Sequence, residues 1–195
     1  MSRKKQSTHK PKKAGKREMS LKGPIWIQRN YENCSGCRRC EIACAISHEG
    51  KTWPEASRVR VFMSVPGVEI PHLCFQCEDY PCVHACPTEA LSINNRTGAV
   101  IVDNSKCTAC GNCIDACPGT VPHMHPQEDH IVICDLCNGK PQCTEACQAG
   151  RWNTLKVVPR DNKISYHAMS KPPDQLTREV GEKILGKEIL MEAFE

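Results

Sequence analysis

Sixteen cysteines constrain the fold of this chain more than any other feature of its sequence. They fall into four groups of four with none left over, and every group ends in a Cys-x3-Cys step. A ligand pattern that recurs four times along one chain indicates an internally duplicated structure. The groups are Cys34-x2-Cys37-x2-Cys40-x3-Cys44, Cys74-x2-Cys77-x4-Cys82-x3-Cys86, Cys107-x2-Cys110-x2-Cys113-x3-Cys117 and Cys134-x2-Cys137-x5-Cys143-x3-Cys147.

A chain of this composition needs such cross-links. Only 5% of its 195 residues are aromatic and 39% are hydrophobic, so an apolar core would be thin. Residues 1–22 contain neither an apolar run of signal-peptide or membrane-span length nor a twin-arginine signal, so we expect a cytoplasmic protein without direct membrane insertion. Disulfides are rare in the cytoplasm, which favours metal ligation for the cysteines.

The charge is unevenly distributed. Nine of the 26 Lys and Arg residues lie in residues 1–22, beside a single acid, Glu18, so the remainder carries a net charge of −4. We interpret residues 1–22 as a basic flexible arm that clasps an acidic partner or the acidic core. Such an arm is also typical of nucleic-acid binding, but no other feature supports that function, so we expect no nucleic-acid partner.

The cysteine spacings favour [4Fe–4S] clusters over zinc. In a C-x2-C-x2-C-x3-C run three sulfurs surround one cubane, and the fourth cysteine ligates another cluster. Zinc sites usually combine two separated C-x2-C pairs. The second and fourth groups alone could be zinc ribbons, whereas the first and third would each have a spare cysteine. The sequence therefore predicts four [4Fe–4S] clusters.

Because each group lends its fourth cysteine, the groups must act in pairs. Residues 90–103 alternate apolar and polar positions around an Asn- and Gly-rich turn, which predicts a β-hairpin joining the second group to the third. Proline after Cys86 and Cys117 predicts short helices that stop there. The predicted inner ligand sets are Cys74, Cys77, Cys82 with Cys117, and Cys107, Cys110, Cys113 with Cys86.

The first and fourth groups would then enclose this inner unit. Residues 25–27 and 155–158 have the length of a matching outer strand pair. The alternative is adjacent pairing of the first group with the second, which the apparent lack of a clean hairpin between Cys44 and Cys74 disfavours. The predicted outer sets are Cys34, Cys37, Cys40 with Cys147, and Cys134, Cys137, Cys143 with Cys44.

Residues 74–91, CFQCEDYPCVHACPTEAL, resemble the four-cluster ferredoxin-like subunits of molybdenum and tungsten oxidoreductases and of some hydrogenases and CO dehydrogenases. The resemblance covers about residues 25–160 and implies an α+β fold of two nested bacterial 2[4Fe–4S] ferredoxin-like units. In that family the nested pairing is the usual one. The departures are Ala45 and Gln148, which stand where proline would follow Cys44 and Cys147.

The run Pro118–Pro126 and the x5 gap of the fourth group are more similar to small subunits of aldehyde oxidoreductase-type tungsten enzymes, including class II benzoyl-CoA reductases. This resemblance implies a large catalytic partner subunit that carries a tungsten- or molybdenum-pterin. It also implies a second partner, such as a ferredoxin, a flavoprotein or another electron-carrier subunit.

We expect three parts in the chain. These are the arm 1–22, a four-cluster domain 23–160 with an outer half (23–73 with 130–160) and an inner half (74–129), and an extension 161–195. Within the extension, residues 174–193 have helical apolar spacing, and Asp174 is the expected N-cap. That helix would pack on its own domain or dock a partner.

No residue is predicted to be catalytic. The loop histidines His123, His125 and His130 would be structural or would act near a cluster, and His84 is expected to pack among the ligands. Arg38 and Arg39 would offset cluster charge or mark a docking surface. The sequence contains no nucleotide or flavin fingerprint, which favours a non-catalytic electron-transfer subunit. The rival interpretations are a free-standing polyferredoxin carrier and, less favoured, a metal-bearing nucleic-acid-binding protein.

Overall fold

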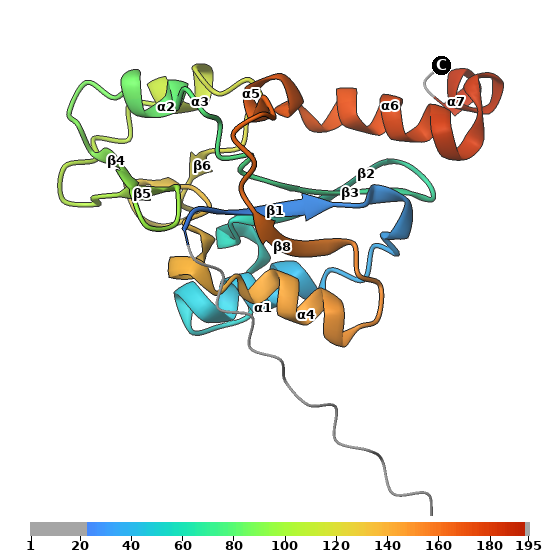
Figure 1. Cartoon of the computed structure of the whole chain (residues 1–195), viewed down its shortest axis with the longest axis horizontal. Coiled ribbons are helices and arrows are strands. Elements are labelled where there is room, and N and C mark those ends of the chain that lie inside the picture. Colours follow the sequence, from blue (N-terminus) through green and yellow to red (C-terminus); the bar gives the residue numbers. More distant parts are fainter. Residues whose placement is uncertain (1–22, 194–195) are drawn as a thin grey trace, which may run out of the picture.

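The outer strand pair forms as predicted. In the computed structural model, which describes residues 23–193, strand β1 (Ile25–Arg29) pairs antiparallel with β8 (Leu155–Pro159) in the register Ile25↔Pro159 to Arg29↔Leu155. Two helices, α1 (Arg39–Glu49) and α4 (Gln142–Ala149), pack on each other below this pair in Figure 1. Segments from both ends of the cysteine region therefore meet. The predicted basic arm lies outside the described residues.

The inner unit repeats this plan within a short stretch of chain. The predicted hairpin consists of β4 (Leu91–Asn94) and β5 (Ala99–Val102), and two short helices, α2 (Pro81–His84) and α3 (Asn112–Asp115), pack together beside it. Pro87 and Pro118 follow closely after these helices, as expected of residues that cannot continue a helix. Ala45 and Gln148 impose no such stop, and α1 and α4 continue past Cys44 and Cys147.

Our prediction that no clean hairpin lies between Cys44 and Cys74 was wrong. Strands β2 (Val59–Val65) and β3 (Val68–Leu73) pair antiparallel across a Pro66-Gly67 turn, with a register shift between Phe62 and Val65. This hairpin contacts α1 and the C-terminal helix α6, and β3 ends directly before Cys74 of the second group. A fourth ribbon, β6 (His123–Met124) with β7 (Ile131–Val132), lies just before the last group. Three 3-10 turns span Tyr31–Asn33, Pro54–Ala56 and Leu136–Gly139.

The C-terminal extension forms α5 (Tyr166–Met169), α6 (Pro173–Leu185) and α7 (Lys187–Ala193). The single helix predicted for residues 174–193 is interrupted at Gly186, whose φ of 86° favours glycine. The predicted N-cap was also wrong, because Pro172 caps α6 and Asp174 lies in its first turn. Helix α6 packs on β2 and β3, which is the self-docking alternative.

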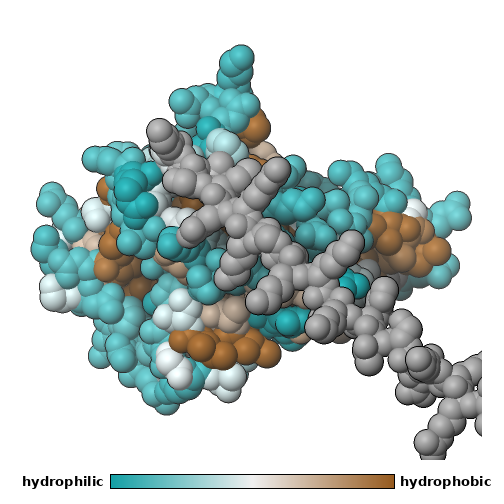
Figure 2. Space-filling view, turned by 60° about the horizontal axis from the view of Figure 1, so that its bottom comes forward, coloured by the Kyte–Doolittle hydropathy of each residue, from teal (hydrophilic) through white to brown (hydrophobic). Residues whose placement is uncertain are grey.

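The core has two parts that β1 separates. Ile25 and Ile27 belong to an apolar cluster that contains most of the buried cysteines, whereas Trp26 belongs to a cluster built from the β2–β3 hairpin, Tyr166 and the C-terminal helices. Exposed apolar side chains include Ile46 on α1 and Ile189 on α7. The face in Figure 2 is mainly hydrophilic, with a few small apolar patches. Within residues 23–193 no helix is long and apolar enough to cross a membrane.

Glu78 fastens the extension to the second cysteine group. Its carboxylate accepts hydrogen bonds from the Ser165 hydroxyl at 2.6 Å and from the Tyr166 and His167 backbone N–H groups at 2.8 and 3.0 Å. These bonds, the one from Ser165 foremost, lower the pKa of Glu78 to about 2. The carboxylate contacts are therefore complete above about pH 4.5 and are lost as the pH falls toward 2.

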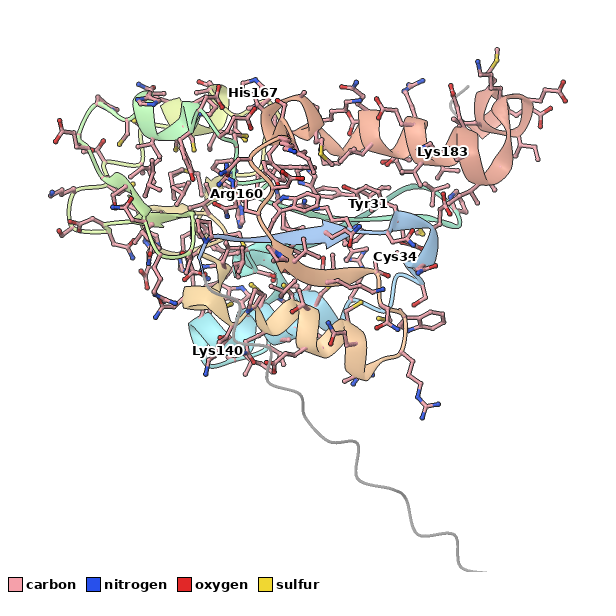
Figure 3. All side chains as sticks on the ribbon, viewed as in Figure 1. Tyr31, Cys34, Lys140, Arg160, His167 and Lys183 are labelled. Carbon is pink, nitrogen blue, oxygen red and sulfur yellow. The ribbon has the colours of Figure 1, made fainter. Side chains whose placement is uncertain are left out.

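We expect Glu78→Gln to loosen this attachment at neutral pH, because an uncharged amide accepts hydrogen bonds more weakly than a carboxylate does. Backbone amides of Tyr166 and His167 (the latter labelled in Figure 3) should exchange faster with deuterium. Glu182→Gln, an exposed carboxylate on α6, is the matched control and should leave these amides unchanged. Equal exchange in the two variants would contradict this role of Glu78.

Candidate metal centres

The fold gathers the sixteen cysteines, all of them free thiols within the described residues, into four sets that mix the sequence groups. Three hollows are each lined by four cysteines, three from one group and the last from another. We name them site 1 (Cys34, Cys37, Cys40, Cys147), site 2 (Cys74, Cys77, Cys82, Cys117) and site 3 (Cys86, Cys107, Cys110, Cys113).

Of the remaining four cysteines, three lie near the fourth, Cys143. Burial is the main cause that raises the pKa of the Cys143 thiol, and the nearby Cys134, Cys44 and Cys137 raise it further. We name this set site 4 (Cys44, Cys134, Cys137, Cys143). In each of the four sets, the fourth cysteine of one sequence group joins the first three of another.

The backbone repeats with the ligand pattern. The residue just before the second cysteine has a positive φ in all four loops: Gly36, Gln76, Ala109 and Leu136. For a residue other than glycine this left-handed conformation costs roughly 1–2 kcal/mol. Such strain persists only where the surroundings hold it, and it clusters at ligand sites. The same left-handed conformation in four loops, three of them without glycine at that position, is consistent with one kind of bound group at all four.

Each group's last cysteine accepts a backbone hydrogen bond from further along the chain. The donors are Arg58 N–H to Cys44 (3.3 Å), Ala90 N–H to Cys86 (3.3 Å), Val121 N–H to Cys117 (3.4 Å) and Leu155 N–H to Cys147 (3.5 Å). An N–H donor stabilises the thiolate over the thiol. The backbone therefore supplies one hydrogen-bond donor to each cysteine that is shared between groups.

The chemistry of the donor sets fits iron–sulfur clusters. Burial raises the pKa of Cys40 and of Cys82 to about 12, and neighbouring acidic groups, chiefly Glu41 and Cys117 respectively, raise it further. Four such thiols would remain protonated by themselves and would become thiolates together only against a cationic centre. A cubane supplies that positive charge and takes four thiolates.

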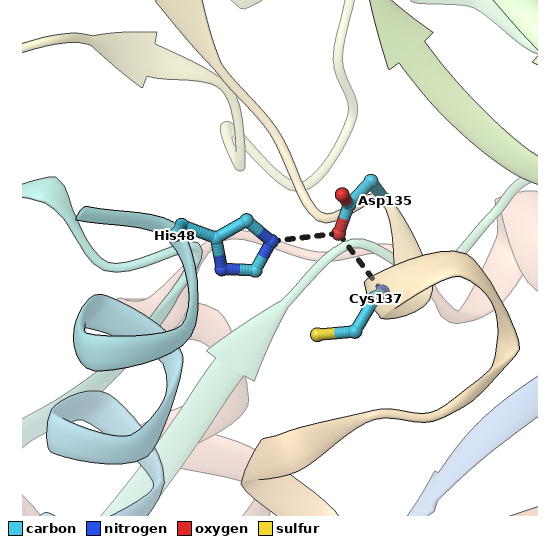
Figure 4. Close-up of side chains that lie close together, drawn as sticks. All are labelled: His48, Asp135 and Cys137. Carbon is cyan, nitrogen blue, oxygen red and sulfur yellow. Dashed lines mark hydrogen bonds and ion pairs between the residues drawn. The ribbon is translucent and has the colours of Figure 1, made fainter. Parts of the chain in front are cut away.

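Site 4 has an ion pair beside it that the sequence analysis missed. His48 lies one helical turn after Cys44 on α1, with its Nε2 3.0 Å from Asp135 Oδ1 and its Nδ1 2.9 Å from the Cys44 carbonyl oxygen (Figure 4). Both ring nitrogens therefore face acceptors, as in an imidazolium. Burial opposes protonation, but hydrogen bonds to Asp135, Cys137 and Cys44 raise the pKa of His48 to about 12. The Cys-x3-His spacing in one helix was the available signal.

Gln76, also missed, ties site 2 to site 4. Its side chain is buried, donates to the Cys134 carbonyl at 2.9 Å and accepts from Val100 N–H at 3.2 Å. Its own N–H donates to Cys74 Sγ at 3.3 Å. One residue thus connects the inner hairpin, the second group and the fourth.

The sequence-predicted histidines lie apart from the cysteine hollows. His125 and His130 stack at 4.8 Å in the β6–β7 ribbon, and His125 Nδ1 accepts backbone N–H bonds from residues 127 and 128, which indicates a structural role. His123 is partly buried, with no hydrogen-bond partner at Nε2. His84 is exposed, so our expectation that it packs was wrong.

Of the two arginines in the first loop, Arg38 lines site 1. Its guanidinium pairs with the buried Glu41 at 3.2 Å. It thus holds the start of α1 beside the ligands, while Arg39 is exposed.

Comparison with known proteins gives the same chemistry. Residues 67–156 match the family described as "4Fe-4S dicluster domain", and residues 31–50 match a "4Fe-4S binding domain". The chain is 47% identical over 164 residues to a Pyrococcus furiosus protein named "Aliphatic sulfonate oxidoreductase, polyferredoxin-like subunit", covering 84% of this chain and 95% of that protein.

Two Escherichia coli proteins are more distant relatives. The "Putative electron transport protein YsaA" is 33% identical (72% of this chain, 92% of that protein), and the "Electron transport protein HydN" is 33% identical (63% and 82%). Among solved structures, a chain of "Active site complex BamBC of Benzoyl Coenzyme A reductase in complex with Zinc" aligns over 88% of this chain and 98% of its own length, with a TM-score of 0.42 and 21% identity.

The grouping of cysteines predicts which substitutions act alike. Cys117→Ser should remove or alter the same paramagnetic signal of the reduced chain as Cys82→Ser, because both belong to site 2. Cys86→Ser should instead act like Cys113→Ser, through site 3. Electron paramagnetic resonance of the four anaerobically purified variants makes this comparison. Shared effects of Cys117→Ser and Cys113→Ser would contradict the grouping.

His123 should make stability depend on pH. Burial, followed by the charge of Arg60, lowers the pKa of His123 to about 4, so between about pH 6.5 and 4 the unfolded chain binds a proton that the folded chain does not. The stabilisation is complete above pH 6.5 and declines as the pH falls toward 4. His123→Gln should lessen the drop in unfolding temperature between about pH 7 and about pH 5, and the exposed His84→Gln should not. Parallel pH curves for both variants would contradict this assignment.

Proposed function

Since the chain belongs to the family of ferredoxin-like [4Fe–4S] electron-transfer subunits, we propose that it binds one cubane cluster at each of sites 1 to 4 and relays single electrons between a catalytic oxidoreductase subunit and a second redox partner. The four cysteines of each site are the proposed ligands. The proposed outer half is residues 23–73 with 130–160, and the inner half is residues 74–129.

The electrostatic contacts among the cysteines suggest the order of the relay. Cys113 of site 3 contributes to the raised pKa of Cys82 of site 2. Cys134 of site 4 acts in the same way on Cys74 of site 2, and Cys40 of site 1 on Cys143 of site 4. On this basis we propose that the sites follow one another in the order 3, 2, 4, 1.

The observation that carries the proposal is where the cysteines reach solvent. Only two of the sixteen, all within the described residues, are exposed: Cys37 of site 1 and Cys110 of site 3. These are the two ends of the inferred order. The middle sites have three buried cysteines each. A relay that exchanges electrons with two partners needs two accessible ends and a shielded middle.

Each cluster would supply a one-electron carrier whose potential depends on hydrogen bonds to the sulfurs, net charge and solvent exposure. The chain sets all three. Backbone N–H groups bond the fourth cysteine of each group, the cations His48 and Arg38 lie beside sites 4 and 1, and burial differs between the middle and the ends. The protein thereby fixes the positions of the four sites and makes them unequal.

The proposed catalytic partner is a large tungsten- or molybdenum-pterin subunit. The proposed substrate of that partner is an aldehyde, an aromatic thioester or an organic sulfonate. The organic sulfonate is included because the relative at 47% identity is named as a subunit of an aliphatic sulfonate oxidoreductase. A ferredoxin or a flavoprotein is the proposed second partner, and the cytoplasm is the proposed location.

Anaerobic purification of the complex through this chain from its native host, followed by metal analysis, tests the proposal. We expect roughly sixteen iron atoms per chain, together with a co-purifying subunit that brings tungsten or molybdenum. Removal of this chain should abolish the activity of the catalytic subunit with ferredoxin as its redox partner. Its activity with an artificial redox dye need not change.

Two other outcomes are informative. Sixteen iron atoms with no second protein would support a free-standing carrier and overturn the partner assignment. About four zinc ions per chain and no iron would overturn the relay itself.

A further inference from the structure

Arg29, the last residue of β1, lies at the point where the two middle sites meet. Its aromatic neighbours, Trp26 and Phe75, belong to the core cluster built from the β2–β3 hairpin and the C-terminal helices. Its Nη2 donates to the carbonyl oxygens of Leu73 at 3.1 Å and of Cys74 at 2.7 Å. The guanidinium is thus bonded to the backbone of a site 2 cysteine.

The cation is held in an apolar setting. Its Cζ lies 4.0 Å from the centre of the Phe75 ring and 5.2 Å from that of Trp26. Its Nε and Nη1 are shielded from solvent and have no hydrogen-bond partner. A guanidinium keeps its proton in proteins, so this is a permanent positive charge.

Within residues 23–193 no salt bridge involves Arg29, and Glu179, which lines the same cavity, pairs with Lys171 at 2.6 Å. The acidic groups that act on Arg29 are the Tyr31 hydroxyl and three cysteines: Cys74 of site 2 and Cys134 and Cys143 of site 4. Burying an unpaired charge costs several kcal/mol, so proteins seldom retain one without an anion nearby. Four thiolates and a cubane carry a net charge of about −2, and two such groups would lie beside this cation.

We propose that Arg29 is the shared counter-cation of the clusters at sites 2 and 4. Its positive charge raises the reduction potentials of both clusters and makes their assembly depend on strand β1. This inference rests on the proposed function. It assigns to a single residue the electrostatics of the middle of the relay. Sites 1 and 3, at the exposed ends, lie outside the contacts of Arg29.

The experiment is a redox titration of the anaerobically purified chain, followed by electron paramagnetic resonance. In Arg29→Gln we expect two of the four one-electron transitions to move to lower potential and the other two to stay in place. The signals that move should be those altered by Cys82→Ser (site 2) and Cys143→Ser (site 4). In Arg29→Lys, which keeps the charge, both transitions should remain closer to the unsubstituted chain.

Arg160→Gln is the matched control. Arg160, labelled in Figure 3, also lies over aromatic rings, 5.0 Å from the centre of Tyr166, but it donates to the Tyr80 hydroxyl at 2.9 Å rather than to the backbone of a cysteine. Its loss should leave all four transitions in place. Equal shifts in Arg29→Gln and Arg160→Gln would reduce the effect to net charge and overturn the proposal.

Iron content keeps the proposal testable if Arg29→Gln does not assemble. We then expect Arg29→Lys to load iron, because the positive charge is retained, and Arg29→Gln to lack iron first at sites 2 and 4. Identical behaviour of the two variants would overturn the proposal, since shape rather than charge would then matter. Unsubstituted chain without iron would instead contradict the proposed function.

Discussion

Burial of sixteen thiol groups in one small chain is the constraint on which the rest of the structure depends. Nine of the cysteines are buried, and burial raises the pKa of thiols such as Cys40 and Cys82 far above neutrality. They become thiolates together only when a cationic centre binds, so folding and metal binding are expected to be coupled. The apolar core contains the cysteines themselves, which explains how so few aromatic residues suffice.

The cysteines are held by two similar units, each made of one strand pair and one helix pair, and the inner unit is inserted in the sequence of the outer one. β1 with β8 and α1 with α4 form the outer arrangement, and β4 with β5 and α2 with α3 form the inner one. In each loop the residue before the second cysteine has a positive φ, and a backbone N–H donates a hydrogen bond to the last cysteine of each group. The backbone conformation therefore repeats together with the cysteine pattern. Side chains that differ between the repeats, such as His48 beside site 4, distinguish otherwise similar sites.

Apolar alternation in residues 90–103 predicted the inner hairpin, and proline placement predicted the short helices, because turn formation and helix termination are local rules. The outer strand pair was predicted because the pairing of cysteine groups required its two segments to meet. The β2–β3 hairpin was missed although residues 59–65 alternate and Pro66-Gly67 marks a turn, because its strands pack on α6, a helix from the far end of the chain. Asp174 was misplaced as a cap because Pro172 already occupies that position. Arg29 and Gln76 could not have been found, because their roles depend on contacts 44 to 58 residues away in the chain.

The central claim is that four cubanes lie in the order of sites 3, 2, 4 and 1, with only the two ends near solvent. Anomalous diffraction at the iron edge from crystals grown anaerobically tests it most directly. The account predicts four compact iron peaks, each enclosed by the cysteines of one site, with those at sites 2 and 4 nearest Arg29. Single metal atoms, or peaks enclosed by cysteines of one sequence group alone, would contradict it.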